Sequence, residues 1–328
     1  MAKGRKKDEA RVILLSNQLS TRNRADMPNV RKVAERYPYV MHLEGQSLER
    51  LYKQLETCRG HSPELVIING GDGTIHSALT FLMNHKIFKN MPAIALLGGG
   101  MTNMNARDLR TGGMPSRSLR NILSCFDELG CSSLYEDRHL LRVDFEDGRQ
   151  SEFGMFFGGA AFANAIRFCT TKIYGIGIKG TLSQVITIFL LLFSLIFRSH
   201  SKGALGYSPE LTLTFDGNEN ANTRFLGLIS TTLHKLVFGS KAPQVPGTFP
   251  FFTLRPNFFA IFASFFLAAR GTIQNSRNRN IDLRFVKTVK ISGCEEFVLD
   301  GEIYNAGKSK TITLSAVGPV KFVSFNKV

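Results

Sequence analysis

The chain has few residues in a pattern that could form disulfide bonds or hold a structural metal ion. It contains five cysteines, an odd number, and neither a C-x-x-C pair nor a histidine cluster accompanies them. This pattern disfavours both a disulfide framework and a structural zinc site. Because free thiols are typical of a reducing compartment, the sequence predicts a cytoplasmic protein.

Long hydrophobic runs and an export signal are also lacking. The basic N-terminus carries Asp8 and Glu9 before a very short apolar run, so we expect no export. The strongest apolar stretch, Thr181–Phe197, is interrupted by polar side chains and is shorter than the roughly 20 residues of a bilayer span. A second stretch, Phe258–Ala269, is shorter still. Both predict buried or membrane-leaning helices rather than true crossings, although insertion of Thr181–Phe197 stays open.

Acidic residues and tryptophan are scarce. Asp and Glu number 26 against 41 Lys and Arg, which gives a net charge of +15, and there is no Trp. The excess predicts anionic partners such as phosphates or an acidic membrane surface. Arginine and aromatic residues interleave too sparsely for nucleic-acid stacking, so we expect no nucleic-acid partner. Basic charge together with apolar stretches suits an enzyme in peripheral contact with the inner face of the membrane.

The order of predicted elements divides the chain into two domains. Residues 1–137 alternate strand-like and helix-like stretches, which predicts an α/β domain with a mostly parallel sheet. Residues 138–314 contain short alternating runs, which predict an all-β antiparallel sandwich. The tail, about 315–328, is a candidate to return to the first domain. Within the second domain, Leu211–Phe215, a turn at Asp216–Asn218 and Arg224–Ser230 predict a hairpin.

A glycine-rich loop, Gly70–Thr74, follows the apolar run Leu65–Ile68. Apolar residues from Ile75 onward recur at helical spacing, so we expect a helix to begin just after Thr74. Glycines at a helix N-terminus let backbone N–H groups approach a phosphate. A carboxylate beside a phosphate is repulsive unless a cation such as Mg²⁺ or a donor group lies between them, so Asp72 reads as a residue that handles Mg²⁺ or the nucleotide. The alternative, that Asp72 caps the helix and the glycines only make a turn, stays open from this loop alone.

A second carboxylate stands near the C-terminus in Asp300-Gly301-Glu302. It follows an apolar run and precedes a glycine, which places Asp300 where a strand ends at a turn. A carboxylate there can accept the proton of a hydroxyl that attacks a phosphoryl group. Taken alone, the Asp–Gly pair favours an ordinary hairpin turn, as it does at Asp216–Gly217.

Three motifs together resemble the diacylglycerol kinase catalytic-domain family of lipid kinases, which includes soluble bacterial lipid kinases and sphingosine kinases. They are Gly70–Thr74, Gly98–Leu109 and Asp300–Glu302, with weaker agreement at Asn17. The resemblance implies ATP-dependent transfer of a phosphoryl group to a hydroxyl of a diacylglycerol-like or sphingoid lipid. It also implies an α/β nucleotide-binding domain, a β-sandwich domain that binds lipid, and a cleft between them.

The same resemblance implies roles for individual residues, with ATP as co-substrate and Mg²⁺ as cofactor. Asp300 would be the general base, Glu302 would orient the acceptor or help to hold Mg²⁺, and Asp72 would contact the metal. The implied nucleotide-binding residues are Asn17, Gly70, Gly71, Asp72, Gly73, Thr74, Gly100, Thr102 and Asn103.

Departures from the family pattern gather near the nucleotide. Asn17–Thr21 lacks the family's proline and glycine, Met101 stands in place of a threonine, and Met104 and Asn105 replace Asp-Phe. Thr102 is a candidate for the missing hydroxyl. Two alternatives therefore stay open beside the lipid kinase: an NAD-kinase-like enzyme, since that superfamily shares the glycine loop, and a peripheral lipid-binding protein without turnover.

Overall fold

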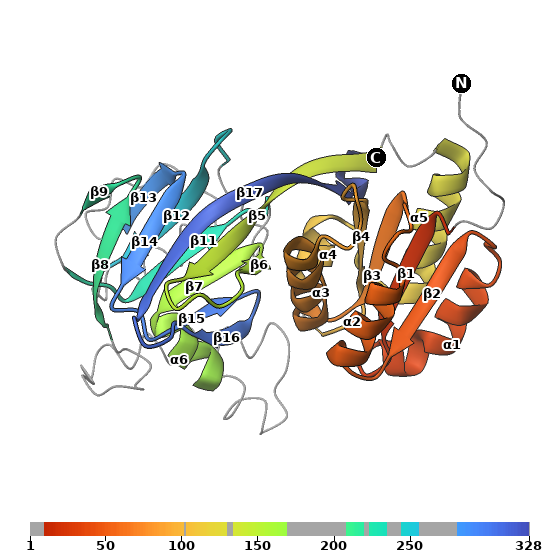
Figure 1. Cartoon of the computed structure of the whole chain (residues 1–328), viewed down its shortest axis with the longest axis horizontal. Helices are drawn as coiled ribbons and strands as arrows, with labels where there is room; N and C mark the ends of the chain where they lie inside the picture. The colour runs from red at the N-terminus through yellow and green to blue at the C-terminus, as the bar shows by residue number, and fades with distance from the viewer. Residues whose placement is uncertain are drawn as a thin grey trace. The chain divides into compact units, whose positions relative to one another are not determined.

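The structure, a computed structural model, describes residues 10–101, 103–129, 134–168, 208–219, 223–234, 244–255 and 281–327. The chain divides into two compact units, one of Met1–His139 with Gly318–Val328 and the other of Leu140–Val317. The long strands β5 (Tyr135–Phe145) and β17 (Thr311–Val323) each contribute residues to both units (Figure 1). Both apolar stretches singled out in the sequence, Thr181–Phe197 and Phe258–Ala269, lie outside the described residues. In the part that is described, helices are too short or too polar to span a bilayer.

The first unit alternates strands and helices as the sequence predicts. Its elements are β1 (Val12–Asn17), α1 (Asn23–Ala34), β2 (Val40–Gly45), α2 (Leu48–Thr57), β3 (Leu65–Gly70), α3 (Asp72–His85), β4 (Ala93–Gly98), α4 (Met104–Asp108), α5 (Pro115–Leu129) and a short 3₁₀ turn, η6 (Phe325–Lys327). The strands β4, β3, β1 and β2 pair in that order and all run parallel. The end of β17 adds a further parallel contact beside β4, between Phe322 and Ile94.

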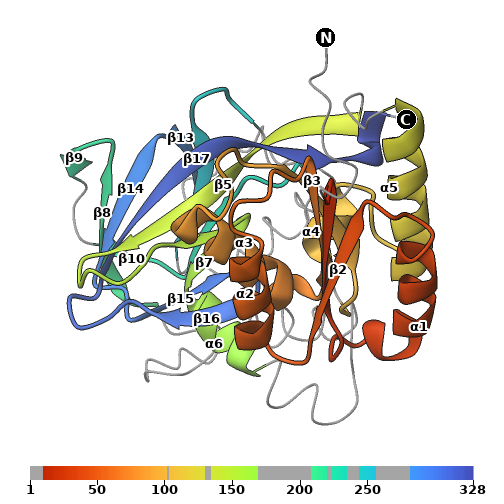
Figure 2. The ribbon, with the colours of Figure 1, turned by 45° about the vertical axis from the view of Figure 1, so that its right-hand side comes forward.

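Helices cover both faces of this parallel sheet. The apolar faces of α1 and α5 pack together over one face, in a core that includes Val30 and Phe126 (Figure 2). On the other face, α2 packs on β2 and α3 packs on β3. Every residue of β3 and β4 is buried, as expected for strands with both faces covered. The predicted α/β architecture with a mostly parallel sheet is confirmed.

The strand order creates one reversal point. From β1 the chain moves to β2 on one side and then to β3 on the other side of β1. Ligands of open α/β sheets bind outside the carboxyl ends of the strands at such a point. The loops that follow β1 and β3 begin at Asn17 and Gly70, the positions where the sequence places nucleotide-binding residues.

The second unit is an antiparallel sandwich, which confirms the predicted all-β architecture. Besides the helix α6 (Ala161–Phe168), its elements are β6 (Glu152–Gly154), β7 (Phe156–Ala160), β8 (Glu210–Phe215), β9 (Asn218–Glu219), β10 (Thr223–Arg224), β11 (Gly227–Thr231), β12 (Phe249–Leu254), β13 (Ile281–Val286), β14 (Thr288–Ser292), β15 (Glu296–Leu299) and β16 (Glu302–Asn305). One sheet has the order β13-β12-β11-β7-β15-β16, and β10-β8-β14-β17 pair in the other. A phenylalanine-rich core with Phe157, Phe251 and Phe297 fills the space between the sheets.

One local prediction for this unit differs from the structure. The expected hairpin between Leu211–Phe215 and Arg224–Ser230 is wrong beyond Arg224, because only the short β10, Thr223–Arg224, at the start of this second segment pairs with β8. From Gly227 the chain passes to the other sheet, where β11 lies between β7 and β12. Residues 225–228 are all buried, so this segment satisfies a central strand better than a solvent-facing hairpin arm.

Candidate functional site

Loops that follow β1 and β3 are joined directly by side-chain hydrogen bonds. The Asn17 amide donates from Nδ2 to Thr74 Oγ1 at 2.9 Å, and its Oδ1 accepts from the Leu19 backbone N–H at 3.0 Å. The backbone N–H of Gly71 donates to Ser20 Oγ at 3.2 Å. Asn17 therefore shapes its own loop and holds the first turn of α3 at the same time. The loop without the family's proline and glycine is fixed by these contacts.

The loop after β4 joins the same group of segments. The Gly99 N–H donates to Gly70 O at 2.8 Å, and the Arg22 N–H donates to Gly99 O at 2.7 Å. A Cβ atom on Gly100 would lie 2.6 Å from the Cα of Gly71, which is closer than real Cβ contacts allow. Glycine at position 100 is therefore required by the close approach of two backbones. The carboxyl ends of β1, β3 and β4 thus meet in one cluster of loops.

Asn103 builds the turn that follows these glycines. Its backbone lies in the left-handed region at φ 51°, and its side chain both accepts from the Gly100 N–H at 2.8 Å and donates to Gly100 O at 2.7 Å. Asn103 is almost fully buried. The structure therefore gives Asn103 a role in shaping the loop. Its neighbour Thr102 lies outside the described residues, and Met101 is 44% exposed.

Helix α3 begins at Asp72, earlier than the position just after Thr74 that the apolar spacing predicts. Gly71 is the N-cap residue in an extended conformation and no side chain caps the helix, so the idea that Asp72 is the cap is wrong. Gly73 and Thr74 instead lie in the first turn. The unpaired N–H groups of a helix N-terminus and its partial positive charge suit an anion. The carboxylate of Asp72 is itself stabilised in that first turn, by roughly 0.3–1 kcal/mol.

The residues present fit a magnesium ion only if a nucleotide brings most of the ligands. Among residues 10–101, 103–129 and the other described segments, no group of three His, Cys, Asp or Glu side chains could hold a metal. Mg²⁺ is usually bound by one or two carboxylates together with substrate phosphates and waters. Asp72 at the start of α3 matches the first requirement.

In the second unit, Asp300 and Gly301 form the two-residue turn between β15 and β16. Both have positive φ, 49° and 94°, and Leu299 pairs with Glu302 across the turn. The Asp300 carboxylate is 3% exposed, and its Oδ1 accepts from the backbone N–H groups of Met155 at 3.0 Å and Phe156 at 2.9 Å. Glu302 is exposed at the start of β16. The hairpin reading of Asp300–Gly301 is correct as geometry, and the carboxylate is held in one orientation.

Sequence patterns gave no sign of the buried polar residues beneath the loops. Asn23, in the first turn of α1, is fully buried and donates from Nδ2 to Asn17 O at 2.7 Å and Asn69 O at 3.2 Å. The Asn69 amide in turn donates to Ser16 Oγ at 3.2 Å. These contacts join residues far apart in the chain, so no local spacing announces them. The one signal in the sequence is that Asn23, a polar residue, stands on the buried face of α1.

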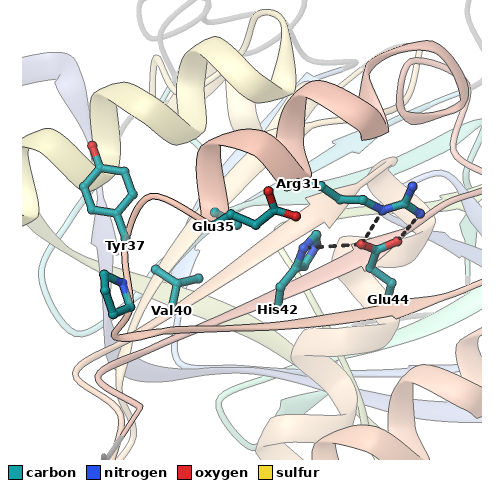
Figure 3. A pocket seen from close by; sticks show the side chains of 8 residues that line it. Arg31, Glu35, Tyr37, Val40, His42 and Glu44 are labelled. Carbon is teal, nitrogen blue, oxygen red and sulfur yellow. Dashed lines mark hydrogen bonds and ion pairs between the residues drawn. The ribbon is translucent and has the colours of Figure 1, made fainter. Parts of the chain in front are cut away.

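A surface pocket lies at the edge of the same unit, where α1 faces β2 (Figure 3). Its lining includes Arg31 of α1, Glu35 just after that helix, and His42 and Glu44 of β2. The Arg31 guanidinium donates to both oxygens of Glu44, at 2.8 and 2.6 Å. This bonding lowers the pKa of Glu44 to about 2. Burial lowers the pKa of His42, and nearby Arg31 acts in the same direction against the carboxylates Glu44 and Glu35.

Part of the first unit matches the model of a known protein family. Residues 11–127 match the family model described as diacylglycerol kinase catalytic domain. This confirms the resemblance drawn from the sequence motifs, and the family is one of kinases. No curated protein matches the chain.

Solved structures resemble the whole chain in fold. A diacylglycerol kinase from Bacillus anthracis is 15% identical with a TM-score of 0.66, over 98% of this chain and 100% of that one. Another structure from the same bacterium, named as a candidate diacylglycerol kinase, is 17% identical with a TM-score of 0.67, over 98% and 99%. A yeast NADH kinase complexed with NADH is 11% identical with a TM-score of 0.51, over 98% and 85%. At these identities the likeness concerns the fold.

Proposed function

We propose that this chain, whose residues 11–127 belong to the diacylglycerol kinase catalytic-domain family, is an ATP-dependent lipid kinase. It transfers the γ-phosphoryl group to a hydroxyl of a diacylglycerol-like or sphingoid lipid. The observation that carries the proposal is the meeting of three loops around the N-terminus of α3, inside the segment that matches the family. Glycines at positions 71 and 100 bring backbone close to backbone there, and a Cβ on Gly70 would meet the Thr74 side chain.

The proposed donor site uses these loops to bind the phosphates of ATP. Gly73 and Thr74 supply amides of the helix N-terminus, where negative charge is favoured, and Gly71, whose N–H donates to Ser20 Oγ, contributes a backbone without a Cβ. Asn17 and Asn103 are assigned to positioning, since their amides hold the loops rather than point at a ligand. Thr102 stays in the proposal as a hydroxyl of the same loop. Mg²⁺ bound beside Asp72 would neutralise charge on the phosphates.

Asp300 is the proposed general base. Two backbone N–H groups orient its carboxylate, the group that we assign to accept the proton of the lipid hydroxyl. Glu302, exposed two residues later, is proposed to orient the acceptor. General-base assistance typically contributes about 10²- to 10⁴-fold to a rate.

A lipid acceptor requires contact with a membrane surface, and the loops of the donor site offer one. Three large apolar side chains are exposed there: Leu19 at 49%, Met101 at 44% and Met114 at 52%. Five exposed arginines lie in the same segments, and none forms an ion pair with another described residue: Arg22, Arg24, Arg107, Arg110 and Arg117. Apolar and basic side chains together favour an anionic bilayer. A cytoplasmic protein at the inner face of the membrane is the setting that we propose.

The test is phosphate transfer from radiolabelled ATP, with Mg²⁺, to a total lipid extract in mixed vesicles and, in parallel, to NAD. Mass spectrometry of the labelled product identifies the acceptor. Label in a lipid supports the proposal. Label in NAD alone would replace it with the NAD-kinase alternative, and vesicle binding without any transfer would leave a lipid-binding protein.

A further inference from the structure

A line of polar groups leads from the pocket at the edge of the first unit to the loops of the donor site. His42 Nε2 lies 2.9 Å from Ser16 Oγ, and His42 Nδ1 lies 3.4 Å from Glu44 Oε1. In Figure 3 the imidazole stands beside Glu44, whose other neighbour is the Arg31 guanidinium. Ser16 and Asn69 are fully buried, and His42 is mostly buried, with 14% of its side chain exposed.

The hydrogen-bond partners determine which nitrogen of His42 carries the proton. The Asn69 amide donates to Ser16 Oγ at 3.2 Å, so the hydroxyl accepts from one side and has its own proton free for His42 Nε2. His42 Nε2 is then the acceptor, and the proton of a neutral ring lies on Nδ1, facing the Glu44 carboxylate. In this arrangement the Asn69 amide, the Ser16 hydroxyl, the neutral His42 ring and the Glu44 carboxylate each have a hydrogen-bond partner.

A serine, a histidine and a carboxylate in this order also occur in hydrolases, but burial excludes that role here. Ser16 has no exposed surface and lies inside β1, between β2 and β3. A nucleophile must reach a substrate carbonyl, and this hydroxyl cannot. The contacts of Ser16 instead point inward, toward β3.

Each member of the line adjoins a loop of the donor site. Ser16 precedes Asn17, and Asn69 precedes Gly70. Glu44 accepts from Gln18 Nε2 at 2.6 Å, which attaches the loop after β1 to the edge strand. A change in the hydrogen bonds of His42 therefore reaches the carboxyl end of β1 through Ser16 and the carboxyl end of β3 through Asn69. Asn17 and Gly70 lie at these two strand ends.

We propose that His42 is a positioning residue for the loops after β1 and β3, and that it holds them in the anion-binding arrangement only as a neutral imidazole. This proposal rests on the proposed nucleotide site. A protonated ring would carry a hydrogen on Nε2, facing Ser16 Oγ, so the hydroxyl could no longer donate to His42 and would have to turn its own proton toward another acceptor.

The groups that face His42 set the pH at which this happens. Ser16 of β1 faces Nε2, and Glu44 of β2 faces Nδ1. Arg31 of α1 and Glu35, just after that helix, line the same pocket. Burial is the main cause that lowers the pKa of His42, so the neutral ring persists at pH 7. Protonation then occurs below the usual imidazole value of about 6.5.

The test measures ADP affinity by calorimetry from pH 5 to pH 8 in the full chain, for the wild type and three variants. His42→Gln keeps an acceptor toward Ser16 and cannot take a proton, so we expect affinity within about twofold of wild type at pH 8 and no added loss at pH 5. His42→Leu removes one hydrogen bond, so we expect about fivefold weaker binding at every pH. His61→Gln, in the loop before β3, is the control and should follow the wild-type profile. Titration of ADP itself affects all four proteins equally.

If the ADP affinity of the wild type falls at low pH by no more than that of His42→Gln, the proposal is wrong. An NMR titration without nucleotide separates this outcome from failure of the donor site. The amide signals of Asn17, Gly70 and Gly71 should follow the titration of His42 in the wild type and should not do so in His42→Gln. That result would support the positioning role of His42 even if ADP does not bind. If these loop amides do not respond to the titration of His42, the proposed positioning role is wrong.

Discussion

Asp300 and Asp216 occupy the same position in two Asp–Gly hairpin turns and direct their carboxylates in the same way. Asp216 has φ 48°, its Oδ1 accepts from the backbone N–H groups of Lys287 and Thr288 at 2.9 and 2.8 Å, and its own N–H donates to Thr288 O. Asp300 repeats this pattern on Met155 and Phe156. The two differ in burial, since Asp300 is 3% exposed and Asp216 is exposed. A turn role therefore explains the geometry of both residues.

This pair provides a matched test of catalysis. We expect Asp300→Asn to lower the rate of phosphoryl transfer at least about 100-fold, because the amide cannot accept the hydroxyl proton. Asp216→Asn makes the same chemical change in an equivalent turn and should leave the rate within about twofold of wild type. Steady-state rates with a lipid acceptor, and urea unfolding of each variant, measure the two effects. Equal rates for Asp300→Asn and wild type would remove Asp300 from the mechanism.

The contact between Gly71 and Gly100 gives a second prediction. We expect Gly100→Ala to force the loops after β3 and β4 apart, since its Cβ would lie 2.6 Å from Gly71 Cα. A change of this kind typically costs about 1–3 kcal/mol of folding free energy. The thermal stabilisation by ADP should also be lost. Gly112→Ala is the control, because the nearest atom to its Cβ is Arg107 Cγ at 3.3 Å, on a flexible side chain. Similar ADP stabilisation in both variants would contradict this account.

The sequence predicted the architecture correctly wherever a local pattern of residues is enough to determine it. The alternation of strand-like and helix-like stretches over residues 1–137 predicted a mostly parallel sheet. Short alternating runs over residues 138–314 predicted an antiparallel sandwich, because such a pattern reflects strands with one covered face. The start of α3 was misplaced since the apolar spacing begins only at Ile75, while the helix is set by Gly71 and Asp72. The partner of Leu211–Phe215 was misplaced because pairing across two sheets is a long-range choice.

The polar layer beneath the loops could not be predicted for the same reason. Asn23, Asn69, Ser16 and His42 lie on four different elements, and each looks unremarkable in its own segment. Only the strand order β3-β1-β2 brings them into line. Motifs with short spacing, such as Gly70–Thr74, were visible because their function lies within one turn of the chain.

Glu44 gives a prediction about acid stability. The two hydrogen bonds from Arg31 depress its pKa to about 2 from the ordinary value of 4.5, so the folded state binds this proton less readily than the unfolded state. The resulting stability is present above pH 4.5 and is lost as the pH falls toward 2. We expect Glu44→Gln to lower the unfolding free energy by about 1–2 kcal/mol at pH 7, after allowance for solvent screening. The difference from wild type should shrink between pH 4.5 and 2.

Urea unfolding at pH 7, 4 and 3 measures this window. The control is Glu49→Gln, which removes the exposed pair between Glu49 and Lys53 on α2. An exposed pair of this kind contributes little, so the control should unfold like the wild type at each pH. A Glu44→Gln deficit that is the same at all three pH values would show that the loss comes from packing rather than from the carboxylate charge.

The last prediction concerns the exposed methionines of the first unit. Met101 lies in the loop after the carboxyl end of β4, whereas Met91 lies just before its amino end, and the two are similarly exposed at 44% and 40%. If the loop face meets the bilayer, Met101→Gln should weaken binding to vesicles that contain anionic lipid about fivefold, through lost apolar burial. Met91→Gln should have no effect. Vesicle sedimentation measures both, and added salt should weaken wild-type binding because the surrounding arginines are screened. Equal losses in the two variants would place the membrane contact elsewhere on the chain.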